Sequence, residues 1–210
     1  SYADHRAMNR GKAHIHGILA EVAHRAKLSK ENTTWLISGF LETIPYQEYV
    51  FSGARQLITD LGPNNVFLMT KSPDVAYQRQ KLDACNLPFF RDNVHEWIVE
   101  AKNPDVFAQW IAMMQDRGAT HLVYGSDEAP EILFAHDAAV NAGLGFEGVH
   151  HQYGPYWKEG LGRAEHVLGN HYHPARNFRQ FAHIIRGFQS RLEGQSQPIE
   201  RKVSYGKEKK

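Results

Sequence analysis

Three segments in the middle of the sequence repeat one pattern, a short apolar run followed by a longer amphipathic segment. The apolar runs are NNVFLMT, VHEWIVEA and THLVYG, and the segments that follow them are PDVAYQRQKLDACNL, NPDVFAQWIAMMQDRG and PEILFAHDAAVNAG. A short apolar run bounded by turn residues is typical of a buried strand, and apolar positions three and four apart are typical of a helix. Successive strand-then-helix units predict a parallel sheet with right-handed crossovers. We therefore expect an α/β protein with a Rossmann-like parallel sheet.

The regions on either side of these units have different patterns. Residues 1–46 place apolar side chains at helical spacing and predict a helical segment, and a further helix is expected from Gln47 to Leu61. Residues 47–192 are assigned to one α/β core that ends in an amphipathic helix, PARNFRQFAHIIRGFQSRL. Between Leu144 and that helix the sequence is rich in glycine and aromatic residues, and its pattern is too weak to predict an element. Residues 193–210 are basic and are expected to form a disordered tail.

Composition excludes several classes of protein. The chain has 210 residues, a formal net charge of +1 and 42% apolar residues, which is typical of a globular protein with no nucleic acid partner. No apolar run approaches the roughly 20 residues of a membrane helix. The single cysteine, Cys85, excludes a disulfide framework and favours a reducing compartment, so we expect a cytoplasmic protein with no membrane partner. The first residue is Ser, which predicts a chain that was processed or trimmed, or that begins inside a longer protein.

Polar residues at the ends of the three predicted strands are the candidates for function. Thr70 ends the first strand, Lys102 follows the second, and an acidic loop with Asp127 and Glu131 follows the third. Because ligands bind at the carboxyl ends of strands in open α/β sheets, we expect Thr70, Lys102 and Asp127 to converge on one crevice. A threonine hydroxyl at a helix start and a lysine both suit an anionic oxygen. Asp127 with Glu128 or Glu131 supplies oxygen ligands of the kind that Mg²⁺ takes.

Each of these residues also has an ordinary structural explanation. A threonine at this place serves as a turn or cap residue, and a lysine after a strand is often solvated. Acidic residues at a helix start favour the helix dipole without binding any metal. The order of the features along the chain is therefore more informative than any one of them.

That order resembles the second, third and fourth motifs of the haloacid dehalogenase-like superfamily, most of whose members are phosphatases. The motifs are the threonine before DVAYQRQKLDACNL, then KNPDVF, then VYGSDEAPEI with AHDAAVNAGL, and the similarity covers roughly residues 40–157. The resemblance implies a core in which Thr70 contacts phosphate and Lys102 stabilises the nucleophile and the phosphate. It also implies a Mg²⁺ site in the loop after Gly125, with Asp127 and Glu131 as ligands. The helical segment 1–46 would then be partly cap-like, and the substrate a small phosphorylated molecule.

The chain departs from this family at two places. Ser126 stands where the family's fourth motif normally has an aspartate, and a serine carries no carboxylate charge. The family's nucleophile and general acid/base form an Asp-x-Asp motif on the first core strand, yet no two aspartates here are two residues apart. Either the strand with the nucleophile lies upstream of Ser1, or the protein is a pseudoenzyme, a non-enzymatic binding or scaffold protein on this fold. The family's first strand is normally central in the sheet, so another element or chain must fill its place, and a homodimer is expected.

Histidines are dense between residues 150 and 173. The five are His150, His151, His166, His171 and His173. Imidazoles at this density bind Zn²⁺ or another transition metal in some proteins, which gives a third hypothesis for function. Their spacing matches no closed zinc site, and the alternative is a polar, aromatic-rich surface segment.

Overall fold

The computed structural model describes residues 15–42, 44–72, 75–89, 95–153, 157–158 and 160–195. The chain divides into two compact units, Ser1–Val50 and Phe51–Lys210, which we call the helical unit and the α/β unit. The sequence placed this boundary after residue 46. No helix in the described parts of the chain is both long enough and apolar enough to cross a membrane.

The helical unit contains two packed helices, α2 (Ile15–Arg25) and α3 (Lys30–Glu42), followed by a 3-10 turn, η1 (Tyr46–Tyr49). Ser29 begins α3 as its cap, because its Oγ accepts a hydrogen bond from the backbone N–H of Asn32 at 3.2 Å. Ala23 and Ile37 are the apolar side chains of this pair that are described as buried.

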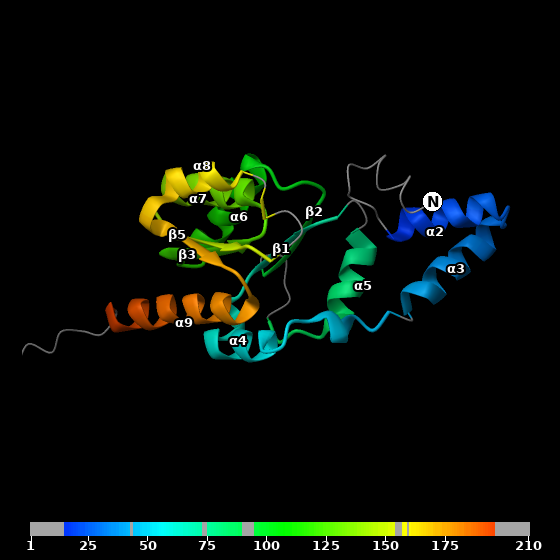
Figure 1. Cartoon of the computed structure of the whole chain (residues 1–210), viewed down its shortest axis with the longest axis horizontal. Helices are drawn as coiled ribbons and strands as arrows, with labels where there is room; N and C mark the ends of the chain where they lie inside the picture. The colour runs from blue at the N-terminus through cyan, green and yellow to red at the C-terminus, as the bar shows by residue number, and fades with distance from the viewer. Residues whose placement is uncertain are drawn as a thin grey trace, which may run out of the picture. The chain divides into compact units, whose positions relative to one another are not determined.

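The α/β unit alternates strands and helices along most of its length (Figure 1). Its strands are β1 (Leu68–Lys71), β2 (Glu96–Val99), β3 (His121–Ser126), β4 (Gly145–His151) and β5 (Tyr172–Ala175). Its helices are α4 (Ala54–Leu61), α5 (Val75–Cys85), α6 (Pro104–Asp116), α7 (Ala129–Asn141), α8 (Leu161–Leu168) and α9 (Phe178–Gln195), with 3-10 turns η2 (Pro63–Asn65) and η3 (Gly169–His171). The prediction of an α/β fold is confirmed.

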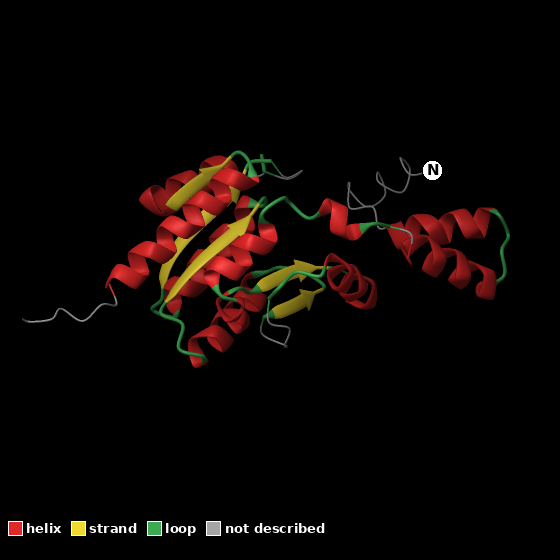
Figure 2. Cartoon of the chain, turned by 90° about the horizontal axis from the view of Figure 1, so that it is seen from below, coloured by secondary structure: helices red, strands yellow, loops and turns green. Residues whose placement is uncertain are grey.

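All strand pairings in the described residues are parallel, and they form two sheets (Figure 2). One sheet has the order β1-β2 and the other the order β3-β4-β5. In the first, Thr70 lies opposite Ile98; in the second, Gly125 lies opposite Val149. Within the described residues β1 pairs only with β2 and β3 only with β4, so each sheet ends in an unpaired edge.

Helices cover both faces of the three-stranded sheet (Figure 1). On one face α6, α7 and α8 bury the larger core, in which Met69 from β1 and Tyr124 from β3 belong to the same apolar cluster. On the other face α9 and α4 bury a second cluster around Val149 and Phe188. Met69 and Tyr124 therefore join the two sheets through one core.

Three parts of the sequence folded differently from expectation. The single helix predicted from Gln47 to Leu61 is wrong, because residues 50–53 are not helical and α4 begins at Ala54. Gly53 adopts φ +87°, which ends helical backbone, and the Phe51 ring stacks on Phe178 at 5.3 Å. β4 lies where no element was predicted, and β5 overlaps the start of the helix predicted from Pro174, which begins at Phe178 instead. α9 continues to Gln195, into the expected tail, and residues 196–210 lie outside the described residues.

Candidate active site

The candidate site lies at the carboxyl ends of β1 and β3, beside the segment that follows β2. Lys71 is the last residue of β1, Ser126 is the last residue of β3, and Lys102 follows β2. Glu131 comes from the first turn of α7, which starts directly after the acidic loop. Pro130 suits this helix start because it has no N–H to satisfy in the first turn.

Glu131 is the centre of the site, and its side chain is only 5% exposed. Lys102 Nζ donates to Glu131 Oε2 at 2.8 Å, and Ser126 Oγ donates to the same oxygen at 2.8 Å. Tyr124 OH donates to Oε2 at 3.3 Å, while Lys71 Nζ donates to Oε1 at 3.3 Å. Every partner is a donor, so the carboxylate is the form of Glu131 that fits this site.

The pKa values of the site follow from these contacts. Burial alone raises the pKa of Glu131, but Lys102, Ser126 and Lys71 outweigh burial and hold it below the ordinary value. Burial lowers the pKa of Lys71, yet its contacts with Glu128 and Glu131 hold it above the ordinary value. Burial, followed by the charge of Glu131, raises the pKa of Tyr124, which stays a neutral donor.

Glu128 completes a balanced set of charges. Its carboxylate accepts a hydrogen bond from Lys71 Nζ, and its backbone N–H donates to Ser126 Oγ at 3.1 Å. Two ammonium groups, on Lys71 and Lys102, thus face two carboxylates, on Glu128 and Glu131. In this state the lysines are neutralised by the protein itself, so an anion competes with the two carboxylates unless a cation binds them.

Of the residues predicted from the sequence, Lys102 and Glu131 are in direct contact. Thr70 is next to Lys71, but its Oγ1 accepts a hydrogen bond from Gln78 Nε2 at 3.0 Å. The structure therefore brings Lys102 and Glu131 together and places Thr70 at the border of the site.

Asp127 lies on the side of the loop that faces the end of β4. Its backbone carbonyl accepts from His150 Nε2 at 3.3 Å, and its charge acts on the pKa values of His150 and Tyr153. Glu131, expected as a metal ligand with Asp127, forms ion pairs with Lys71 and Lys102 in this structure. The described residues contain no group of three or more His, Cys, Asp or Glu side chains arranged to hold a metal ion.

The sequence alone did not reveal the roles of Lys71 and Tyr124. A signal for Tyr124 was present, because strand residues two apart share a face and Tyr124 is two residues before Ser126. Lys71 ends its strand next to Thr70, and only the approach of β1 to α7 shows that its ammonium reaches Glu128. That approach depends on tertiary packing.

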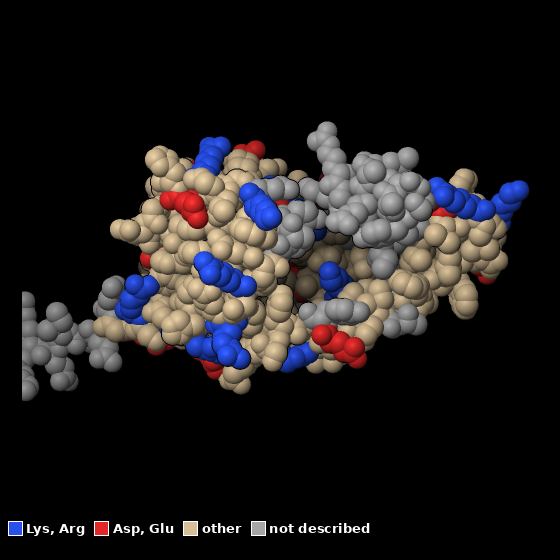
Figure 3. Space-filling model, viewed as in Figure 1, with Lys and Arg blue, Asp and Glu red and all other residues tan. Residues whose placement is uncertain are grey.

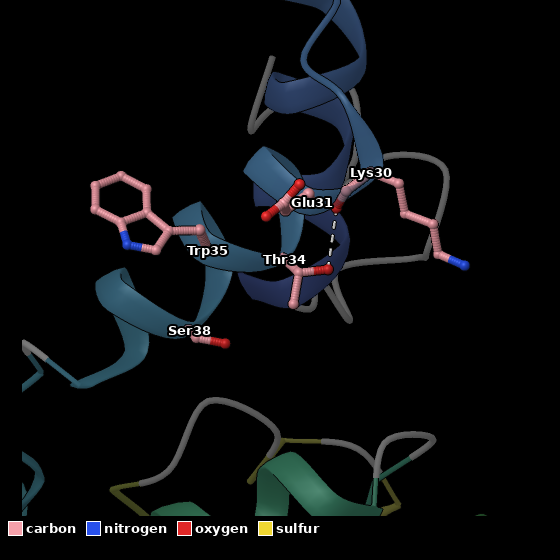
Figure 4. A pocket seen from close by; sticks show the side chains of 5 residues that line it. All are labelled: Lys30, Glu31, Thr34, Trp35 and Ser38. Atoms are coloured by element: carbon pink, nitrogen blue, oxygen red, sulfur yellow. Dashed lines mark hydrogen bonds between the residues drawn. The ribbon is translucent and has the colours of Figure 1, made fainter.

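The helical unit has a hollow of its own, of about 690 Å³, along α3 (Figure 4). It is lined by Lys30, Glu31, Thr34, Trp35 and Ser38. Thr34 Oγ1 donates back to the carbonyl of Lys30 at 3.0 Å, and the Trp35 side chain is 76% exposed. All of the lining residues come from one helix, so the hollow lacks the converging polar groups of the site in the α/β unit.

Both basic and acidic side chains of the described residues lie on the face that Figure 3 shows. Comparisons of the chain with protein-family models, curated proteins and solved structures find no match. The chemistry of the site therefore rests on its own geometry.

Proposed function

We propose that the α/β unit is the core of a Mg²⁺-dependent, phosphatase-type hydrolase of the haloacid dehalogenase-like class, and that its attacking carboxylate comes from outside the described residues. The observation that carries this proposal is the meeting of Lys71, Lys102, Ser126 and Glu131 at the carboxyl ends of parallel strands. This edge is where open α/β sheets bind their ligands.

The unpaired sheet edges support the proposal independently. β1 and β3 each have a free edge among the described residues, while Met69 and Tyr124 share one core and Lys71 reaches Glu128. A further parallel strand between β1 and β3 would join the two sheets and satisfy both edges. The family resemblance implies a central strand of this kind, with the nucleophile at its carboxyl end and hence beside Lys71 and Lys102.

The residues present divide the remaining work between them. Lys102 and Lys71 offset the charge of a phosphoryl group, and the Thr70 hydroxyl contacts one of its oxygens. Asp127, Glu128 and Glu131 offer the hard oxygen ligands that Mg²⁺ prefers. Mg²⁺ supplies charge stabilisation to the phosphoryl oxygens when it is bound. A cation bound to these carboxylates also weakens their ion pairs with the lysines. Phosphate and Mg²⁺ should therefore each raise the affinity of the site for the other.

The second candidate is a binding or scaffold protein on the same fold. It is favoured by the neutralisation of both lysines within the site and by the absence of any Asp-x-Asp pair in the sequence. Such a protein is not expected to bind phosphate at Lys102 in a Mg²⁺-dependent way. This difference in phosphate binding distinguishes the two candidate functions.

Calorimetric titration of the chain with inorganic phosphate, with and without Mg²⁺, tests the proposal. We expect measurable binding only with Mg²⁺, and its loss in Lys102→Ala. Lys27→Ala is the matched control, because Lys27 is exposed in the turn between α2 and α3 of the helical unit. Binding that needs no Mg²⁺, or that survives in Lys102→Ala, would favour the scaffold protein.

A further inference from the structure

Three aromatic side chains, Phe51, Tyr153 and Phe178, form what we call the aromatic cluster at the carboxyl end of the three-stranded sheet. Tyr153 comes shortly after the end of β4, and Phe178 is the first residue of α9, shortly after β5. Phe51 precedes α4, which packs against α9 (Figure 1). Because parallel strands end at one edge of a sheet, the aromatic cluster lies at the same edge as the loop with Asp127.

The Phe51 ring is held in place and yet remains accessible. It stacks on Phe178 with centroids 5.3 Å apart and an interplanar angle of 8°, and it meets Tyr153 edge-on at 5.5 Å. Ala54 N donates to the Phe51 carbonyl at 2.9 Å, and Gly53, with φ 87° and ψ −3°, has the conformation of the third residue of a type II turn. Phe51 is nevertheless 55% exposed. It therefore offers apolar area on which a further flat ring can stack.

Contacts link the aromatic cluster to the acidic loop. The His151 ring, at the end of β4, stacks on Tyr153 at 5.2 Å, and a Cβ on Gly125 would lie 2.9 Å from its Nε2. Burial and then the charge of Asp127 raise the pKa of Tyr153 to about 12, so Asp127 is close to this phenol. The Tyr153 hydroxyl is buried and has no hydrogen-bond partner among the described residues. Tyr153 therefore lies between the acidic loop and the exposed ring of Phe51.

This arrangement bears on which substrates the proposed hydrolase site would accept. We propose that Phe51, stacked on Phe178, binds the leaving group of the substrate, and that this group carries a flat aromatic ring of the nucleobase kind. The inference rests on the proposed function, because it takes the phosphoryl group to be bound at Lys71 and Lys102.

The chemistry of the aromatic cluster sets the selectivity. Neither Phe51 nor Phe178 carries a hydrogen-bonding side chain, so stacking selects a flat ring but not one particular base. Because Tyr153 lies between Asp127 and Phe51, the substrate needs a spacer between its phosphate and its ring. A pentose provides such a spacer, whereas a sugar phosphate without a ring leaves Phe51 uncovered.

The contacts of Phe51 also have an ordinary structural explanation, because they anchor residues 50–53 to α9. Calorimetric titration of the chain in the presence of Mg²⁺ separates the two explanations with a pair of ligands, adenosine 5′-monophosphate and ribose 5-phosphate. The two share the phosphate and the pentose, and the nucleotide alone has the aromatic ring. A purely structural role of Phe51 gives no difference between them.

Two variants and one control accompany the titration. Phe51→Ala removes the ring, and Phe51→Trp keeps a flat ring at the same place. Val140→Ala is the matched control, because Val140 is an apolar residue of nearly equal exposure, 56%, close to the end of α7 that lies farthest from the acidic loop.

We expect the wild type to bind the nucleotide at least about tenfold more tightly than ribose 5-phosphate, as stacking of a base on an aromatic side chain provides. Phe51→Ala should abolish this preference and leave the affinity for ribose 5-phosphate unchanged. Phe51→Trp and Val140→Ala should both retain the preference.

Equal affinity of the wild type for the two ligands, or a preference that survives in Phe51→Ala, would overturn the proposal and leave the phosphoryl site standing. Equal weakening of both ligands in Phe51→Ala would also overturn it, because the ring would then act only through the fold. If neither ligand binds in the presence of Mg²⁺, the proposed function itself fails, and this substrate class fails with it.

Discussion

At the level of single residues, His151 shows how a buried imidazole couples stability to pH. Its ring stacks on Tyr153 at 5.2 Å and meets Phe181 edge-on at 4.2 Å. Its Nε2 is buried without a hydrogen-bond partner among the described residues, and a Cβ on Gly125 would lie 2.9 Å from it. Burial, with a smaller effect of His150, lowers the pKa of His151 from 6.5 to about 4. Between about pH 4 and pH 6.5 the folded protein therefore holds this ring neutral, whereas the ring is protonated in the unfolded chain.

This difference predicts a loss of stability in mild acid. Between the two pKa values the unfolded state binds more protons, so the free energy of unfolding falls as the pH falls. For His151 the loss is about 2 kcal/mol between pH 7 and pH 5. His151→Phe keeps an aromatic ring but cannot titrate, so urea unfolding at the two pH values should show a loss smaller by that amount.

The exposed His166 provides the control for this experiment. His166→Phe leaves the His151 ring in place, so the part of the pH dependence that comes from His151 should remain. If the His151→Phe and wild-type proteins lost equal stability between pH 7 and pH 5, the ring of His151 would not be neutral in the folded state.

Residue types at strand ends allowed part of the site to be predicted. Lys102 and Glu131 were singled out because each follows a predicted strand, at the end of an open α/β sheet where ligands bind. Their pairing with each other, and the contact of Lys71 with Glu128, follow from how α7 packs against two different strands. Sequence pattern gives the end of a strand at which a residue lies, but not the partner that its side chain reaches.

At the level of elements, the sequence predicted β1, β2 and β3 because each is a short apolar run between turn residues. β4 was missed because Gly145 and Gly148 interrupt its apolar pattern. Gly145 makes room for the His121 ring, and a Cβ on Gly148 would lie 2.6 Å from Ile132. The glycines that weakened the strand signal are therefore required by close packing against β4.

The unpaired edge of β1 makes an amide-exchange prediction. Leu68 N donates to the carbonyl of His95 at 2.7 Å, and Ser72 N donates to that of Val99 at 2.8 Å, so both face β2. Successive strand residues direct their backbone groups to opposite sides, so the N–H groups of Met69 and Lys71 face the free edge.

In hydrogen exchange of the chain by itself, Met69 should therefore exchange much faster than its neighbour Leu68. The two amides lie in one strand and share its local stability, which makes Leu68 an internal control. Equal protection of the two amides would mean that the edge of β1 is already paired, and the proposal of an additional central strand would fail.

At the level of the α/β unit as a whole, the two ends of the sheet carry different chemistry. The carboxyl ends hold lysines and carboxylates, which suit a phosphoryl group with a hard cation, and the amino-terminal end holds imidazoles around Glu147. Parallel strands make this separation possible, because all of them point the same way. The parallel sheet was predicted from the sequence. Nothing in the sequence indicated that His171 and His173 lie toward the opposite end of the strands from the acidic loop.

A backbone NMR titration of the chain with inorganic phosphate, in the presence of Mg²⁺, tests the proposed phosphoryl site at Lys71, Lys102 and Ser126. We expect the amide signals of Lys71, Lys102 and Ser126 to shift together, with one dissociation constant, while that of His171 does not move. Without Mg²⁺, or in Lys102→Ala, these shifts should disappear. If the three signals stay unchanged, or respond to phosphate equally well without Mg²⁺, the carboxyl ends of these strands are not a metal-dependent phosphoryl site.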